Sequence, residues 1–263
     1  MIMGPYKTLK ITTQKRLLII TLNRPEKKNA FNREMYLELT NALNEAAENN
    51  NILITAITGS GDFYSSGNDL NNFLWKYSAD NVDEQARESS HMFENFINAF
   101  INFPKILIAV VNGPCIGVAA TTAAICDVIY ASETAYFHTP FTSMALNPEG
   151  CSSYTFPRIL GKSKANEMLL LNYKLTSEEA YKLGFVSELF SKNSLSNIWS
   201  KLEDLSLLPL QSVIESKKLI KRFEQEKLRI AHELETMTLN ERKVSEEAIT
   251  AVMNFMSRRK SKL

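Results

Sequence analysis

The chain has 263 residues, of which 44% are hydrophobic and 22% charged, and these proportions argue against a disordered chain, a collagen or a coiled coil. Its 30 Lys and Arg against 29 Asp and Glu leave a net charge of +1, without the overall basic excess that nucleic-acid-binding proteins carry. The length predicts one large domain, or one domain with an appendage.

The first third of the sequence predicts two strands, a helix and a third strand. Apolar and β-branched residues indicate strands at 7–11, 16–22 and 52–58. A polar loop with a proline follows the second strand, and Asn32 is placed to cap the helix after it. Strands and helices in this succession indicate layered α/β packing.

The middle of the chain contains its most apolar window, at 106–131. An Asn-Gly-Pro turn interrupts that window, so we expect a buried strand, a turn and a small-residue helix at 117–124, not a membrane span. Residues 71–90 are polar and charged with little clear period, which is typical of a mobile loop or a fraying helix. Aromatic residues between 93 and 100 then recur at helical spacing, as in a core.

The last part of the chain has the pattern of helices without strands. A capping box at Thr176 and Glu179 opens a helix, and after about residue 195 the strand signals cease. The remaining residues predict three or four helices. We therefore expect a core at 1–195 and a helical region at 196–263.

The sequence patterns of several common kinds of site are missing from this chain. The cysteines form no close pair, which is typical of free thiols in a reducing compartment, and the histidines are scattered without metal-ligand spacing. There is no phosphate-binding P-loop, no complete dinucleotide fingerprint and no GxSxG serine motif. The cysteines are Cys115, Cys126 and Cys151, and the histidines are His91, His138 and His232.

Three loops that follow strands remain as places for chemistry. The loop at 64–70 holds a glycine among small polar residues, which frees backbone N–H groups to face a ligand. The loop at 112–118 leads into a helix whose N-terminus suits an anion or oxyanion. The loop at 147–153 places Glu149 between proline and glycine. Each of them alone is typical of an ordinary turn, cap or solvated loop.

Taken together and in order, the motifs of this chain resemble the crotonase, or enoyl-CoA hydratase/isomerase, family. The resemblance runs from about residue 8 to residue 189. It rests on Asn23-Arg24-Pro25 with Asn29-Ala30-Phe31, on Ser66-Gly67-Asn68-Asp69-Leu70, and on Ala109-Val110-Val111-Asn112-Gly113-Pro114 with Gly117. The third loop, Asn147 to Tyr154, and the terminal Ser261-Lys262-Leu263 are similar to the peroxisomal Δ3,Δ2-enoyl-CoA isomerase branch.

The resemblance implies a fold and a set of catalytic groups. The expected fold is α/β, a spiral of ββα turns followed by a helical C-terminal region that assembles trimers or hexamers. The backbone amides of Asn68 and Val118 would form an oxyanion hole for a thioester, and Glu149 would be the single acid/base. The hydratases of the family carry two glutamates elsewhere, and here those two positions hold Thr121 and Phe141.

The resemblance also implies an acyl-CoA substrate, so coenzyme A enters as part of the substrate and no cofactor or metal is expected. The residues expected to bind the substrate are Ser65, Ser66, Gly67, Asn68, Asp69, Leu70, Gly117, Arg24, Lys27 and Lys28. Weaker candidates for the phosphates are Lys217, Lys218, Lys221 and Arg222, where a solvated face is the more ordinary interpretation. Phe73, Trp75 and the aromatics at 93–100 could line an acyl tunnel or pack in the core.

The expected reaction is the shift of a 3-enoyl-CoA double bond, cis or trans, to 2-trans-enoyl-CoA in the β-oxidation of unsaturated fatty acids. Two alternatives remain open: another crotonase reaction such as hydration, and a non-catalytic acyl-CoA-binding or scaffold protein. The terminal tripeptide predicts import into the peroxisomal matrix through a receptor that recognises Ser-Lys-Leu.

Overall fold

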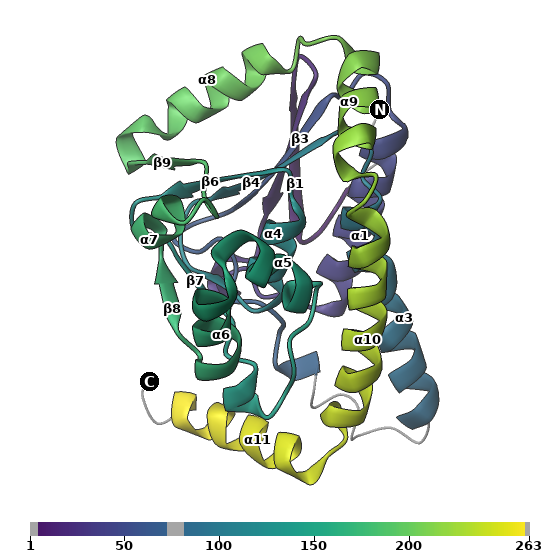
Figure 1. Ribbon diagram of the computed structural model, residues 1–263, viewed down its shortest axis with the longest axis vertical. Coiled ribbons are helices and arrows are strands. Elements are labelled where there is room, and N and C mark those ends of the chain that lie inside the picture. The colour runs from purple at the N-terminus through teal and green to yellow at the C-terminus, as the bar shows by residue number, and fades with distance from the viewer. Residues whose placement is uncertain (1–4, 73–81, 261–263) are drawn as a thin grey trace.

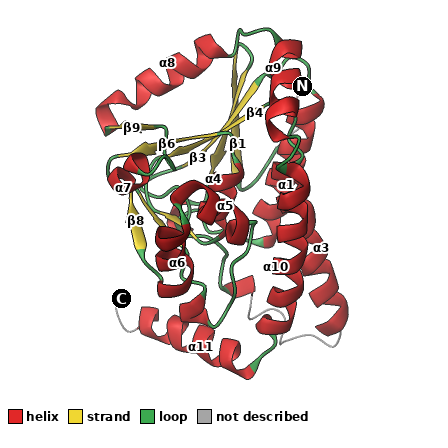
Figure 2. Cartoon of the chain, viewed as in Figure 1, coloured by secondary structure: helices red, strands yellow, loops and turns green. Residues whose placement is uncertain are grey.

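The structure is a computed structural model that describes residues 5–72 and 82–260. It is an α/β fold in which a six-stranded sheet is covered by helices and a small three-stranded sheet lies beside it (Figures 1 and 2). The large sheet has the order β1 (Leu9–Gln14), β2 (Leu17–Leu22), β3 (Ile54–Gly59), β4 (Ile106–Val111), β6 (Val128–Ser132) and β9 (Glu188–Phe190). Its first pair is antiparallel and the other neighbours are parallel. The expected α/β class is confirmed.

The small sheet and the helices complete the described part of the chain. The small sheet has the order β5 (Cys115–Ile116), β7 (Tyr136–His138) and β8 (Lys174–Thr176). The helices are α1 (Arg33–Glu48), α3 (Val82–Ile101), α4 (Val118–Ile125), α5 (Ser152–Leu160), α6 (Lys162–Leu171), α7 (Ser177–Lys182), α8 (Leu195–Leu205), α9 (Leu210–Lys221), α10 (Gln225–Lys243) and α11 (Glu246–Lys260). Short 3-10 turns are Pro25–Lys27, Thr142–Met144 and Lys192–Ser194.

Both faces of the large sheet are buried, as is usual for parallel strands. Strand β2 shows this directly, because Leu17 packs in one hydrophobic cluster and Leu18 in the other. Helix α8 covers the smaller cluster with Ile198 and Leu202 (Figure 1). Helix α9 packs against the same cluster through Leu210 and Val213. The larger cluster lies on the other face and includes Tyr64, Val118 and Cys151 from the three loops.

The helix caps and the C-terminal helices predicted from the sequence are present in the structure. The side chain of Asn32 accepts a hydrogen bond from the Met35 N–H at 2.9 Å and caps α1. The capping box of Thr176 and Glu179 is present at the start of α7. Beyond residue 195 the described chain forms four helices, as predicted.

Of the two alternatives expected for residues 71–90, a mobile loop or a fraying helix, the structure shows a helix in the second half. Residues 82–90 are the first part of α3, while 73–81, with Phe73 and Trp75, lie outside the described residues. Contacts with distant elements hold this end of the helix. Arg33 on α1 pairs with Glu88 at 3.0 Å, and Asn240 on α10 donates to the Ser90 hydroxyl at 3.0 Å. The sequence pattern does not show these partners, so it left the choice between a loop and a helix open.

Candidate active site

The first functional loop begins at Ser65 and is held by its own side chains and by Asn29. The Asn29 amide donates to the carbonyl oxygens of Ser60 and Phe63 at 2.9 and 2.8 Å. The Ser65 hydroxyl donates to the Asn29 carbonyl at 2.7 Å and accepts the Gly67 N–H at 3.0 Å. The Ser65 side chain therefore shapes the loop. Asn29 belongs to the family motif, but sequence reasoning gave it no task.

The backbone amide of Asn68 is left available by this arrangement. Gly67 turns the chain with a φ of +82°, and its carbonyl accepts the Phe31 N–H at 2.8 Å. The Asn68 side-chain oxygen accepts from the Tyr36 hydroxyl at 3.3 Å and from the Asn72 amide at 2.9 Å. Within residues 5–72 and 82–260, the Asn68 N–H has no hydrogen-bond partner.

The second amide lies at the start of α4. Gly117 precedes the helix with a φ of +58°, and its own N–H donates to the His138 carbonyl at 2.8 Å. Val118 is the first residue of the helix, where an N–H has no intrahelical acceptor. Among the described residues this N–H has no other partner, and it lies at the positive end of the helix dipole.

The two loops touch through their glycines. A Cβ added to Gly67 would lie 2.6 Å from the Ile116 carbonyl oxygen and 3.5 Å from the Gly117 Cα. Only glycine permits so close an approach of two backbones. The residues that follow the two glycines, Asn68 and Val118, therefore present their amides from adjoining loops.

The third loop places Glu149 against the same helix. Gly150 has a φ of +63°, and a Cβ added to it would lie 2.3 Å from the Thr121 Oγ1 on α4. Thr121 lies one helical turn after Val118, so the loop packs beside the helix end that carries the second amide. The Ser152 hydroxyl donates to the Glu149 carbonyl at 2.7 Å and fixes its backbone.

The pKa of the Glu149 carboxyl lies near neutral pH. Its side chain keeps a small opening to solvent, yet protein surrounds it, and burial raises its pKa to about 7. The Lys243 ammonium opposes that rise in pKa, and the Glu235 carboxylate adds to it. A carboxyl whose pKa lies near the working pH is suited to taking and returning a proton.

Tyr36 connects this base with the first amide loop. Burial raises the pKa of the Tyr36 hydroxyl well above its usual value, and the negative charge of Glu149 adds to the effect. The hydroxyl therefore stays protonated and donates to Asn68. Tyr36 comes from α1, and the sequence alone gave it no role.

The two positions where hydratases of the family would carry carboxylates are occupied by protein packing. Thr121 is fully buried, and its hydroxyl donates to the Val118 carbonyl at 3.1 Å. Phe141 is 2% exposed in the core. Of the three positions 121, 141 and 149, the last is the one that holds a carboxylate, in the loop that packs on α4.

The basic residues of the first loop separate into two groups. Arg24 pairs with Asp69 at 3.2 Å, and both side chains are mostly buried, so this pair joins two loops of the site. Lys27 and Lys28 are exposed, and the Lys28 ammonium lies 5.0 Å from the Phe63 ring centre. These two lysines stay candidates for phosphate binding.

Two of the weaker phosphate candidates, Lys217 and Lys221, form ion pairs inside the protein. Lys217 and Lys221 pair with Asp127 at 2.6 and 3.3 Å, and Lys221 also donates to the Ile125 carbonyl at 3.0 Å. They neutralise Asp127 and bind the C-terminal end of α4, where cations are favoured. Their charges are engaged inside the protein, which makes them unsuited to phosphate binding. Lys218 and Arg222 are exposed.

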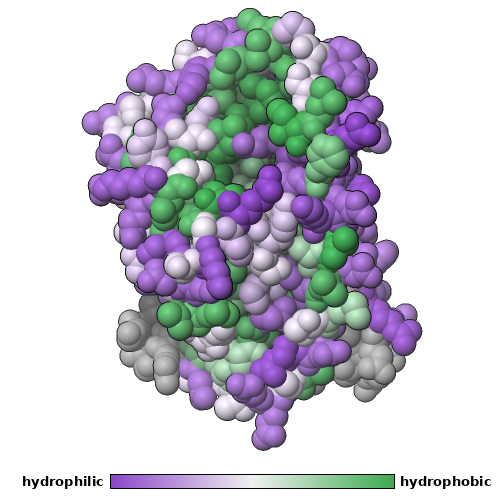
Figure 3. Space-filling view, viewed as in Figure 1, coloured by the Kyte–Doolittle hydropathy of each residue, from purple (hydrophilic) through white to green (hydrophobic). Residues whose placement is uncertain are grey.

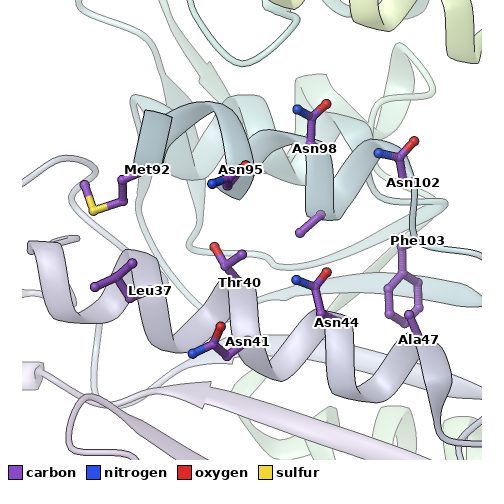
Figure 4. A pocket seen from close by; sticks show the side chains of 11 residues that line it. Leu37, Thr40, Asn41, Asn44, Ala47, Met92, Asn95, Asn98, Asn102 and Phe103 are labelled. Atoms are coloured by element: carbon purple, nitrogen blue, oxygen red, sulfur yellow. The ribbon is translucent and has the colours of Figure 1, made fainter. Parts of the chain in front are cut away.

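A groove of about 390 Å³ between α1 and α3 lies apart from these loops (Figure 4). Neutral amide side chains from both helices face it, and neither Glu149 nor the two amides line it. The residues that give it this character are Thr40, Asn41, Asn44, Asn95, Asn98 and Asn102.

The described part of the chain holds neither a metal-ligand cluster nor a membrane-spanning helix. No group of His, Cys, Asp and Glu side chains in residues 5–72 and 82–260 is arranged to hold a metal ion. Among the same residues, no helix has both the length and the apolar character needed to cross a bilayer.

Comparison with known proteins defines the family. The sequence model of the enoyl-CoA hydratase/isomerase family matches residues 12–263. The chain is 44% identical over 259 residues to enoyl-CoA delta isomerase 2 of Homo sapiens, covering 98% of this chain and 65% of that protein. It is 42% identical over 259 residues to the peroxisomal enoyl-CoA delta isomerase 3 of Mus musculus, covering 98% and 81%.

The fold comparison agrees with the sequence comparison. The crystal structure of an enoyl-CoA hydratase/isomerase from Pseudoalteromonas atlantica superposes with a TM-score of 0.86 at 32% identity, covering 96% of this chain and 98% of that one. The chain belongs to the enoyl-CoA hydratase/isomerase, or crotonase, family, and the resemblance found in its motifs is confirmed. It spans 65% of the length of the human isomerase 2.

Proposed function

We propose that the chain is a Δ3,Δ2-enoyl-CoA isomerase, which converts 3-cis- or 3-trans-enoyl-CoA to 2-trans-enoyl-CoA in the oxidation of unsaturated fatty acids. The observation that carries the proposal is the carboxyl of Glu149, with its pKa raised to about 7, in a loop packed on the helix that begins with the Val118 amide. That amide and the amide of Asn68 in the adjoining loop have no partner among the described residues. The names of the human and mouse relatives, enoyl-CoA delta isomerases, support the same reaction.

The proposed mechanism moves one proton across the substrate. The Glu149 carboxylate takes a proton from C2, and the C2–H electrons form the enolate of the thioester, conjugated with the C3–C4 double bond. The amides of Asn68 and Val118 donate to the enolate oxygen, each worth about 3 kcal/mol by analogy with oxyanion-hole deletions. Glu149 then returns the proton to C4 while the double bond forms between C2 and C3.

Isomerisation needs one carboxylate, whereas hydration needs a second group to activate water. Thr121 and Phe141 supply no such group, which favours isomerisation over the hydratase alternative. The reaction moves only a proton and a double bond, so it requires neither a redox cofactor nor a metal. Coenzyme A takes part as the carrier of the substrate.

Binding of the substrate is proposed at the same loops. Lys27 and Lys28 would meet the phosphates of coenzyme A, because their charges are exposed beside the first loop. The backbone at 65–70 and Gly117 would hold the thioester end. Arg24 and Asp69 would act indirectly, since their ion pair holds the loop that carries Asn68.

A single assay separates the proposed function from its rivals. Incubation with 3-hexenoyl-CoA should produce a conjugated 2-enoyl thioester, which absorbs in the ultraviolet. A hydratase would instead convert 2-hexenoyl-CoA to the 3-hydroxy product. A non-catalytic acyl-CoA-binding protein would bind either thioester and change neither.

Assembly and location are part of the proposal. Figure 3 shows apolar surface gathered at the end of the molecule formed by α8 and α9. In the last turn of α9 and just after it, Leu219, Ile220 and Phe223 are 67–79% exposed. Such a patch suits the subunit contacts of a homotrimer or hexamer, and sedimentation would give the number of chains. The name of the mouse relative supports a peroxisomal location, and Ser261-Lys262-Leu263, outside the described residues, would be the import signal where it is a free C-terminus.

A further inference from the structure

The loop that carries Glu149 is held from the C-terminal helical region by Glu235 on α10. One carboxylate oxygen of Glu235 accepts the Cys151 N–H and the other accepts the Ser153 N–H, each at 2.7 Å. These amides lie at the N-terminal end of α5, where a helix leaves N–H groups unsatisfied. Burial raises the pKa of Glu235, whereas the hydrogen bonds from Ser153 and Cys151 lower it and favour the ionised form, in which both oxygens accept. Glu235 is 6% exposed.

Helix α10 binds the loop on both sides of Glu149. The Asn147 side chain donates to the Glu235 carbonyl at 3.1 Å, so Glu235 contacts the chain before and after the base. Between these contacts, Gly150 and Cys151 both have a φ of +63°. A left-handed conformation costs a residue such as cysteine about 1 kcal/mol or more, so it persists only where other contacts hold it.

Resting on the isomerase function proposed above, we propose that Glu235 is a positioning residue for Glu149, which fixes the loop carrying the base and places a second negative charge beside it. This assigns a task in the reaction to the C-terminal helical region. It does so through hydrogen bonds that span more than eighty positions in the chain.

The electrostatic part of the proposal has a definite direction. The titratable groups that act on Glu149 are Tyr36 from α1 and Lys243 and Glu235 from α10. Burial makes the largest contribution to its raised pKa, and the charge of Glu235 raises it further. Removal of that charge therefore lowers the pKa of Glu149.

The test is the variant Glu235→Gln. Its amide can accept from one of the two N–H groups but turns a donor toward the other, so the loop must shift. We expect kcat with 3-hexenoyl-CoA to fall about tenfold or more and KM to change less than about twofold, because small displacements of a base cost rate. The acid limb of the kcat profile should move to lower pH. A kcat and a pH profile equal to those of the wild type would overturn the proposal.

A matched control separates positioning from stability. Glu38 on α1 holds backbone in the same way, accepting the Lys7 and Thr8 N–H groups at 2.7 and 2.8 Å away from the site. Glu38→Gln should lower the melting temperature but keep the kcat and pH profile of the wild type. If both variants lose only stability, Glu235 is merely structural and the proposal is wrong.

Two further measurements keep the proposal testable on its own. Glu235→Asp retains the charge with a shorter reach, so it should lower kcat while the acid limb stays near that of the wild type; an unchanged kcat contradicts the proposal. The titration of Glu149 can also be followed by NMR of 13C-labelled glutamate, with Glu149→Gln identifying the signal. Its midpoint should fall in Glu235→Gln, and an unchanged midpoint contradicts the proposal even if the wild type shows no isomerase activity, which would refute only the proposed function.

Discussion

Gly150 lies directly against Thr121: a Cβ added to the glycine would be 2.3 Å from the threonine Oγ1 and 3.0 Å from its Cβ. This contact places the loop of Glu149 on α4, at a position where a hydratase of the family would carry a carboxylate. The loop that carries Glu149 therefore fills the space beside position 121, where a hydratase would have a carboxylate.

The contact predicts that Gly150→Ala reduces isomerase activity strongly, because the loop must move away from α4 to make room for the methyl group. Gly161→Ala is a matched control, since Gly161 also has a positive φ, +78°, but nothing lies within 4 Å of an added Cβ. Both variants should lose about 1 kcal/mol of stability from backbone strain. Only Gly150→Ala should lose kcat as well, and equal activities in the two variants would contradict the packing described.

The pKa of Glu149 predicts the pH dependence of the rate. A general base acts in its ionised form, and with a pKa of about 7 only about a tenth of Glu149 is ionised at pH 6. We expect kcat to rise with pH to a plateau above about pH 8, and to be about tenfold lower at pH 6. Initial rates across this range check the prediction, and a flat profile down to pH 5 would be inconsistent with it.

The same pKa predicts a change of stability with pH. The folded state raises the pKa of Glu149 from an ordinary value of 4.5 to about 7, so it favours the protonated form. Between these values the folded state binds more protons than the unfolded state, and stability from this group falls as pH rises. Glu149→Gln should therefore be more stable than the wild type at pH 8, by about 1–3 kcal/mol, with the difference vanishing below about pH 4.5. Denaturant unfolding of both proteins at pH 8 and at pH 4.5 measures this difference in the free energy of unfolding. The same difference at the two pH values would contradict the prediction.

Phosphate binding by the first loop predicts a salt-dependent effect on substrate affinity. Replacement of Lys27 and Lys28 by glutamate should raise KM several-fold and leave kcat unchanged, because uniform binding is lost. The effect should shrink at high salt, which screens exposed charges. Lys10→Glu is the control, since Lys10 is exposed on β1 and is not a candidate for phosphate binding. A KM that rises equally in the control would point to net charge and not to this loop.

The features that the sequence predicted well are those fixed by neighbouring residues. Strand β4 and the turn after it follow from an apolar run and an Asn-Gly-Pro break, and Asn32 caps α1 because its acceptor lies three residues away. The family motifs also pointed to Asn68, Val118 and Glu149 as site residues; the loops of the first two are in contact, and the loop of the third packs on α4, while the roles of the three residues stay a prediction. Their proposed chemistry remains for experiment.

The features that the sequence did not predict depend on contacts between distant residues. Glu235 reaches Cys151 across the fold, and its surroundings in the sequence are those of an ordinary charged helix. Lys217 and Lys221 form a solvated pattern in the sequence, yet Asp127 binds both of them inside the protein. The periodicity and composition of the sequence do not show which distant residues will be partners. The roles of these charged side chains are therefore visible only in the folded structure.

The most direct test of the account is the rate of conjugated-product formation from 3-hexenoyl-CoA by the wild type and by Glu149→Gln. Glutamine keeps the size of the side chain but cannot take a proton, so turnover should become undetectable while the affinity for the acyl-CoA, measured by calorimetry, stays within about threefold. A Glu149→Gln variant that isomerises at the wild-type rate would contradict the central claim.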